Sequence, residues 1–139
     1  MGDAIWLFFG TPKWFLSNVQ DPMAVGILSV FPFVGILCLV AGVALAVWRR
    51  NRFLWRFGLP FLGCQALVVV AGFLRGSLDN SITTYILAPF IAVMLGWSLF
   101  LVVRAKCARI AALLLAVFTL SYASYASFVS WMSFTDTWL

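Results

Sequence analysis

Residues 23–48 read MAVGILSVFPFVGILCLVAGVALAVW, and residues 49–56 continue as RRNRFLWR. The first stretch contains no charged residue, and it is longer than the roughly 20 residues that a helix needs to cross the hydrocarbon core of a bilayer. The second stretch carries four arginines. An apolar run that ends in a basic gap is typical of a transmembrane helix whose end lies at the cytoplasmic face.

The same pattern recurs along the chain. Four apolar runs occupy residues 23–48, 54–75, 82–103 and 108–134, and their charged residues lie at or near their ends: Arg56 and Arg75 in the second run and Arg109 in the fourth. Strands of a membrane barrel are only about 10 residues long and alternate in polarity, which these runs do not. The sequence therefore predicts an all-α fold: an integral membrane bundle of four transmembrane helices.

The overall composition supports lipid as the solvent. Of the 139 residues, 65% are hydrophobic and 9% are charged, whereas a soluble domain is about half apolar and a quarter charged. The net charge of +5 resides mainly in short gaps between apolar runs, unlike the basic face of a nucleic-acid reader. The expected partners are therefore the lipid bilayer and other membrane subunits or copies of this chain, and not nucleic acid.

The distribution of charge predicts the orientation. Seven basic residues lie in or beside the first and third gaps: Arg49, Arg50, Arg52, Arg56, Arg104, Lys106 and Arg109. The four acidic residues lie in the N-terminal segment, the second gap and the C-terminus: Asp3, Asp21, Asp79 and Asp136. Because Lys and Arg in short loops stay cytoplasmic, both termini are predicted to face outward. The expected location is a plasma membrane of the bacterial inner-membrane type, crossed several times.

The N-terminal segment, residues 1–22, is aromatic but too short to span, and Pro12 and Pro22 are expected to break any long helix. We predict an interfacial or re-entrant segment on the outer face, preceding a four-helix domain over residues 23–139. Expected interfacial anchors are Trp6, Phe9, Trp14, Trp131 and Trp138. A docking surface for a neighbouring subunit is the alternative interpretation of these aromatic residues.

The spans lack the groups of a reactive centre. The chain has no histidine and no glutamate, and no Asp or Lys lies near the middle of a run, which argues against a proton relay and against histidine-ligated haem. Cys38, Cys64 and Cys107 form no CxxC pair and have no neighbouring ligand residues in sequence, which argues against zinc. We expect neither enzymatic activity, catalytic residues, metal nor cofactor.

Small and polar residues within the runs predict helix packing. Gly35 and Gly42 form a close-contact face in the first run, and the amide of Gln65 needs a partner because lipid offers none. In the fourth run, the residues on one helical stripe are Thr119, Tyr122, Ala126, Ser130 and Ser133. The alternatives are a ligand or ion contact at Gln65 and a pore or lipid head-group site along the stripe.

These features favour an accessory, scaffold or assembly subunit of a larger membrane complex. Two other functions remain open: a pore or carrier formed by self-association, and an immunity-type or regulatory protein that binds another membrane protein.

Overall fold

The computed structural model describes residues 2–17, 27–48, 52–105 and 108–136, and every regular element in these ranges is helical. In chain order the elements are α1 (Gly2–Ser17), α2 (Ile27–Trp48), the short 3₁₀ helix η1 (Arg52–Phe57), α3 (Gly58–Phe73), α4 (Asn80–Arg104) and α5 (Arg109–Thr135). The prediction of an all-α fold is confirmed.

Within the described ranges, three helical segments are long and apolar enough to cross a membrane: Leu54–Phe73, Asn80–Arg104 and Arg109–Thr135. The last two agree closely with the predicted runs 82–103 and 108–134. The predicted run 54–75 is divided between η1 and α3, and Pro60 lies in the first turn of α3, where a missing backbone N–H costs little. The described apolar part of α2, Pro32–Trp48, is shorter, so four spans remain a prediction.

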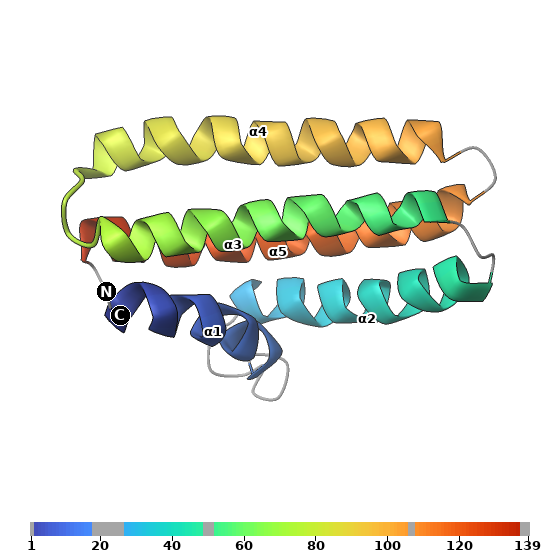
Figure 1. The fold of residues 1–139 in the computed structure, drawn as a ribbon, viewed down its shortest axis with the longest axis horizontal. Coiled ribbons are helices and arrows are strands. Elements are labelled where there is room, and N and C mark those ends of the chain that lie inside the picture. The colour runs from blue at the N-terminus through green and yellow to red at the C-terminus, as the bar shows by residue number, and fades with distance from the viewer. Residues whose placement is uncertain (1, 18–26, 49–51, 106–107, 137–139) are drawn as a thin grey trace.

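Helix α5 is the centre of the bundle. It lies between α2 on one side and α3 and α4 on the other, and all three pack along it (Figure 1). Most of its buried positions are small or hydroxylated, including Ala112, Ala126 and Ser130, which are all fully buried. Small side chains allow helices to approach closely in lipid, where packing rather than water exclusion drives association. This composition explains why α5 accommodates three neighbours.

Two glycines of α2 lie at its close contacts with α5. A Cβ atom on Gly42 would lie 2.9 Å from Cγ of Leu115, and one on Gly35 would lie 3.1 Å from Cβ of Ser121. A Cβ on Gly63 of α3 would lie 2.7 Å from Cε of Met94. The absence of a side chain at Gly35 and Gly42 therefore lets α2 lie close against α5, whereas the neighbour of Gly63 is the flexible end of the Met94 side chain.

The N-terminal segment forms one helix, α1, which continues through Pro12 to Ser17. The expectation that Pro12 breaks it is wrong, because packing offsets the one backbone bond that proline removes. Every third or fourth residue of α1 is buried: Ala4, Leu7, Thr11 and Phe15. This face packs on α3, where a Cβ on Gly72 would lie 2.6 Å from Cα of Ala4. Residues 18–22 of the predicted segment lie outside the described ranges.

Helix α1 covers only part of the bundle. It lies beside the end of the bundle where α1 begins and α5 ends, here called the terminal end, and α2 extends along α5 toward the opposite end (Figure 1). Phe15, close to the end of α1, contacts Tyr122 near the middle of α5, with ring centroids 5.1 Å apart. Helix α1 thus packs mainly on α3 and reaches α5 near its middle, at Phe15.

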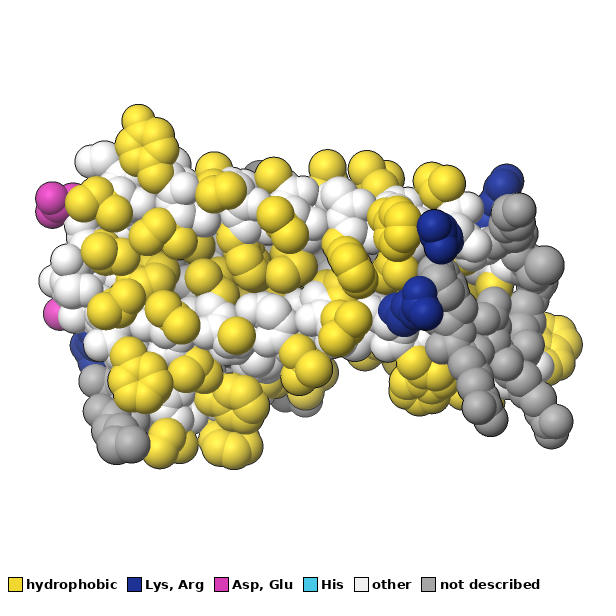
Figure 2. All heavy atoms as spheres, turned by 45° about the horizontal axis from the view of Figure 1, so that its top comes forward, with side chains coloured by type: hydrophobic (Ala, Val, Ile, Leu, Met, Phe, Trp, Pro, Cys, Tyr) yellow, Lys and Arg dark blue, Asp and Glu magenta, His cyan; other side chains and the backbone are white. Residues whose placement is uncertain are grey.

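The terminal end of the bundle is held together by hydrogen bonds. The N–H of Gly76 donates to the carbonyl of Ser133 at 3.0 Å, and Arg75 Nε lies 2.8 Å from a carboxylate oxygen of Asp136. At the opposite end of the bundle, α4 ends at Arg104 and α5 begins at Arg109. Figure 2 shows most of the visible basic side chains at this opposite end and the acidic ones at the terminal end. The bundle therefore carries opposite charges at its two ends.

Candidate functional site

The polar residues singled out in the sequence lie inside the bundle. Gln65 Nε2 donates a 2.7 Å hydrogen bond to the hydroxyl oxygen of Tyr122, linking α3 to α5. The hydroxyl of Ser133 donates to the carbonyl of Ala71 at 3.0 Å, and that of Thr119 to its own helix. The α5 stripe is thus buried against neighbouring helices of the same chain.

Several buried polar atoms have no hydrogen-bond partner among the described residues. They are Oε1 of Gln65 and the hydroxyl oxygens of Thr83, Ser98, Ser127 and Ser130. They are distributed over α3, α4 and α5, and none belongs to a group that titrates near neutral pH. This interior offers hydrogen-bonding capacity, but no acid–base pair.

The predicted aromatic anchors have different environments. Trp6 and Phe9 are exposed on α1, and Trp6 contacts Trp14 edge to face with ring centroids 4.5 Å apart. Trp131 is half-buried and stacks on Phe128. Trp138 lies outside the described ranges. The exposed face of α1 thus carries aromatic side chains, while its other face packs on the bundle.

The basic residues that predict topology are described in part. Arg56, Arg104 and Arg109 are exposed at the end of the bundle opposite the termini, and the guanidinium carbon of Arg104 lies 5.1 Å from the ring centroid of Phe100. Arg52 begins η1. Arg49, Arg50 and Lys106 lie outside the described residues.

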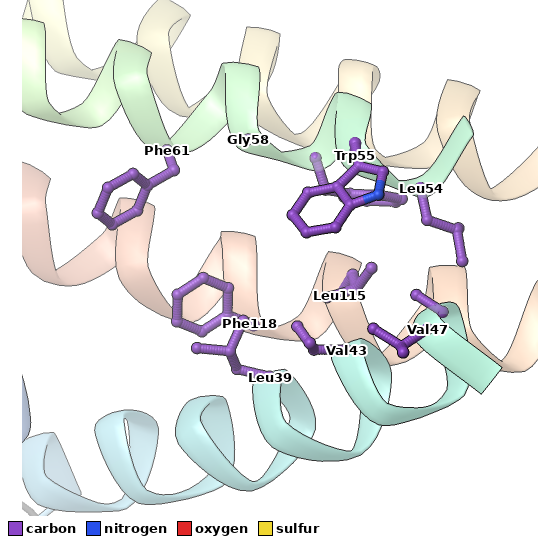
Figure 3. Close-up of a pocket in the computed structure, with 11 residues that line it drawn as sticks. Leu39, Val43, Val47, Leu54, Trp55, Gly58, Phe61, Leu115 and Phe118 are labelled. Carbon is purple, nitrogen blue, oxygen red and sulfur yellow. The ribbon is translucent and has the colours of Figure 1, made fainter. Parts of the chain in front are cut away.

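An apolar cleft lies between α2 and α3, with α5 as its floor. Its volume is about 280 Å³. Helix α2 contributes Leu39, Val43, Ala46 and Val47; η1 and α3 contribute Leu54, Trp55, Phe57, Gly58 and Phe61; and α5 contributes Leu115 and Phe118 (Figure 3). No residue of α1 lines the cleft.

Aromatic rings close the cleft at mid-depth. Phe61 and Phe118 line it, and both contact Tyr122, with ring centroids 4.9 and 6.0 Å apart. On the other side of this cluster, Tyr122 contacts Phe15 of α1. The cleft is therefore a blind groove, separated from α1 by the aromatic cluster of Phe15, Phe61, Phe118 and Tyr122.

Sequence reasoning did not identify this cleft. It depends on where α1 ends and on the distance between α2 and α3, neither of which follows from hydropathy. The residue that indicates the cleft locally is Gly58, which follows the basic gap. A Cβ atom at this position would meet no atom within 4 Å. Gly58 therefore differs from the packed glycines Gly35, Gly42, Gly63 and Gly72.

A second feature that sequence reasoning missed is the outer face of α4. Ala88, Ala92 and Gly96 recur every four residues and are all exposed, and a Cβ on Gly96 would meet no atom within 4 Å. The four-residue spacing was visible in the sequence, but it became informative only once the structure showed which face of α4 is unpacked.

Among the residues whose placement is described, no three His, Cys, Asp or Glu side chains are grouped as metal ligands would be. No family model, curated protein or solved structure matches the chain. Its function is therefore interpreted from the cleft, the buried polar groups and the exposed helix faces.

Proposed function

We propose that the chain is a four-span membrane protein that serves as an accessory or scaffold subunit of a larger membrane assembly. The observation that carries this proposal is the outer face of α4. This long apolar helix packs on its own chain by one side only and presents a row of small residues on the other.

The packing of α4 differs from that of its neighbour. Only 22% of the most apolar stretch of α4 is buried inside the chain, against 56% for α5. The exposed row of Ala88, Ala92 and Gly96 is continued by larger side chains: Tyr85 is 81% exposed and Val103 is 72% exposed. The face therefore has a shallow centre between bulkier ends.

A shallow row of this kind suits another helix. In lipid, helices associate where small residues let the backbones approach, because the bilayer provides no hydrophobic driving force between them. Elsewhere in this chain, Gly35 and Gly42 are covered by α5 in this way. By the same physical rule, a helix of a partner subunit would cover the equivalent row on α4.

The proposal includes an orientation, with the first and third gaps cytoplasmic and both termini outside. The positions of Arg56, Arg104 and Arg109 at one end support it, since such residues favour the cytoplasmic side. The contact of Arg75 with Asp136 supports a shared outer side for the second gap and the C-terminus. Antiparallel packing of α2 along α5 supports a fourth crossing (Figure 1).

The interior supports a structural role over a pore. The hydroxyl stripe of α5 includes Thr119, Ser130 and Ser133, each at most 3% exposed. Side chains packed in this way form contacts within the chain rather than the wall of a water-filled path. No observation on the described residues favours an immunity-type role over a general subunit role.

The test is purification of the tagged full chain from its native membrane in mild detergent, with the native particle mass and the identity of co-purifying proteins as readouts. Gly96→Leu should reduce the co-purifying subunits because the added side chain fills the row on α4. Ala41→Leu, at an exposed position on α2, is the matched control and should leave them unchanged. Isolation of the wild-type chain as a monomer without partners would refute the proposal.

A further inference from the structure

We propose that the cleft between α2 and α3 binds one acyl chain of an anionic phospholipid, with the phosphate group near Arg56 and Arg109. This assigns a ligand to a site that a subunit role does not require. The inference rests on one part of the proposed function, namely that the end of the bundle with Arg56 and Arg109 lies on the cytoplasmic side. The lipid would then come from the inner leaflet.

The size of the cleft selects a chain rather than a helix. Its volume of about 280 Å³ is close to the lower limit of ligand pockets, which run from about 300 to 1,000 Å³. The lining of α2 extends from Leu39 to Val47, which corresponds to roughly 12 Å at the rise of an α-helix. A partner helix, about 10–12 Å wide with its side chains, is too thick to enter.

The lining of the cleft is suited to hydrocarbon. It consists of aliphatic and aromatic side chains together with Gly58. Phe61 and Phe118 form the closed end, where Tyr122 packs behind them. A flexible chain that enters from the charged end would therefore terminate against aromatic rings at mid-depth.

The mouth of the cleft lies beside the basic end of the bundle. Val47 and Trp55 line the cleft and are 61% and 74% exposed, so the cleft is accessible from the side. An acyl chain can therefore enter laterally from the bilayer without leaving the apolar phase. Trp55 in this position is typical of indoles at the level of lipid head groups.

The basic residues at this end of the bundle favour an anionic head group. Arg56 in η1 is exposed at the end of the bundle where the cleft-lining residues Val47 and Trp55 lie. Arg109 begins α5 beside Ala108, which belongs to the same buried cluster as Leu54 and Phe57. The acidic side chains that the structure describes, Asp79 and Asp136, lie at the opposite end. Basic pockets between membrane helices on the cytoplasmic side bind anionic head groups for this reason.

The first experiment tests the cleft. Full-length protein in detergent is equilibrated with an equimolar mixture of phosphatidylglycerol and phosphatidylcholine that carry the same acyl chains, and retained lipid is measured by native mass spectrometry. Gly58→Leu should lower retained phosphatidylglycerol by about fivefold or more, since the new side chain occupies the cleft. Ala41→Leu is the matched control, because Ala41 is exposed on α2 and does not line the cleft. Val47→Phe at the mouth provides a second test if Gly58→Leu does not fold.

The second experiment tests the head group in the same mixture. Wild-type protein should retain phosphatidylglycerol over phosphatidylcholine by about fivefold, and Arg56→Gln with Arg109→Gln should abolish this preference. Arg75→Gln, at the opposite end, should leave it unchanged. Equal retention of both lipids by wild-type protein would overturn the anionic assignment, and unchanged retention in Gly58→Leu and Val47→Phe would overturn the site. Neither readout depends on partner subunits, so failure here is distinct from failure of the proposed function.

Discussion

Gln65 Nε2 lies 2.7 Å from the hydroxyl oxygen of Tyr122, and this hydrogen bond joins α3 to α5 beside the closed end of the apolar cleft. Both side chains are at most 4% exposed, so neither can exchange the bond for one to water. Tyr122 also contacts Phe15, Phe61 and Phe118. The bond therefore fixes the orientation of the ring around which the aromatic cluster is built.

Removal of either partner of this bond should destabilise the bundle non-additively. Tyr122→Phe leaves the Gln65 amide buried without its partner, whereas Gln65→Leu combined with Tyr122→Phe removes both groups. We expect a coupling free energy of about 1 kcal/mol in a double-mutant cycle measured by unfolding in mixed micelles. Ser124→Ala, at an exposed position of α5, serves as the control. Strictly additive losses would show that the bond contributes nothing to stability.

The attachment of α1 should depend on Gly72. Gly72→Ala would place Cβ 2.6 Å from Cα of Ala4, a backbone atom that cannot rotate away. We expect the free energy of unfolding to fall by about 1–3 kcal/mol in total, although alanine favours a helix over glycine by about 1 kcal/mol. The measurement is unfolding in mixed micelles, together with thiol labelling of Leu7→Cys, whose position is 1% exposed.

Gly96→Ala is the control for the Gly72 variant, because its Cβ meets no atom within 4 Å. It should leave the stability of detergent-purified protein unchanged or raise it by up to about 1 kcal/mol. If both alanine variants behave alike and Leu7→Cys stays protected in each, α1 does not rely on close contact at Gly72.

The parts of the fold that could be predicted from the sequence are the helices whose ends are marked by charged residues. Arg104 and Arg109 interrupt the hydropathy at the positions where α4 ends and α5 begins, so both helices were placed to within two residues. The all-α class followed from the length of the apolar runs. Hydropathy alone was sufficient for this because a charged side chain within hydrocarbon is costly.

The parts that could not be predicted depend on which helices meet. Pro12 indicates a break when α1 is considered alone, yet α1 continues through it, with buried residues on both sides, Thr11 before it and Phe15 after it. The spacing of Gly35 and Gly42 indicated a contact face but not that α5 would cover it. The cleft has no motif because it is the space left where α1 ends near Phe15, and a space of this kind has no residue pattern of its own.

The proposed orientation predicts opposite labelling at the two ends of the bundle. In a background carrying Cys38→Ala and Cys64→Ala, the native Cys107 reports on the third gap, and Ser77→Cys reports on the turn between α3 and α4. A membrane-impermeant maleimide should label Ser77→Cys in intact cells and Cys107 only after permeabilisation. Labelling of Cys107 alone in intact cells would invert the orientation, and partial labelling of both would indicate dual topology.

Asp136 should tolerate loss of its charge better than a change in backbone preference. It ends α5 in the left-handed region, with φ of 53°, which Asp, Asn and Gly adopt more readily than branched residues. Its ion pair with Arg75 is about half exposed, so the pair should contribute at most about 1 kcal/mol and less at high salt. Asp136→Asn and Asp136→Gly should therefore shift the unfolding free energy by less than about 1 kcal/mol, while Asp136→Val should lose about 1–2 kcal/mol more. Thermal unfolding at low and high salt measures both contributions. If Asn and Gly lose as much as Val at low salt and recover at high salt, the ion pair rather than the backbone determines how α5 ends.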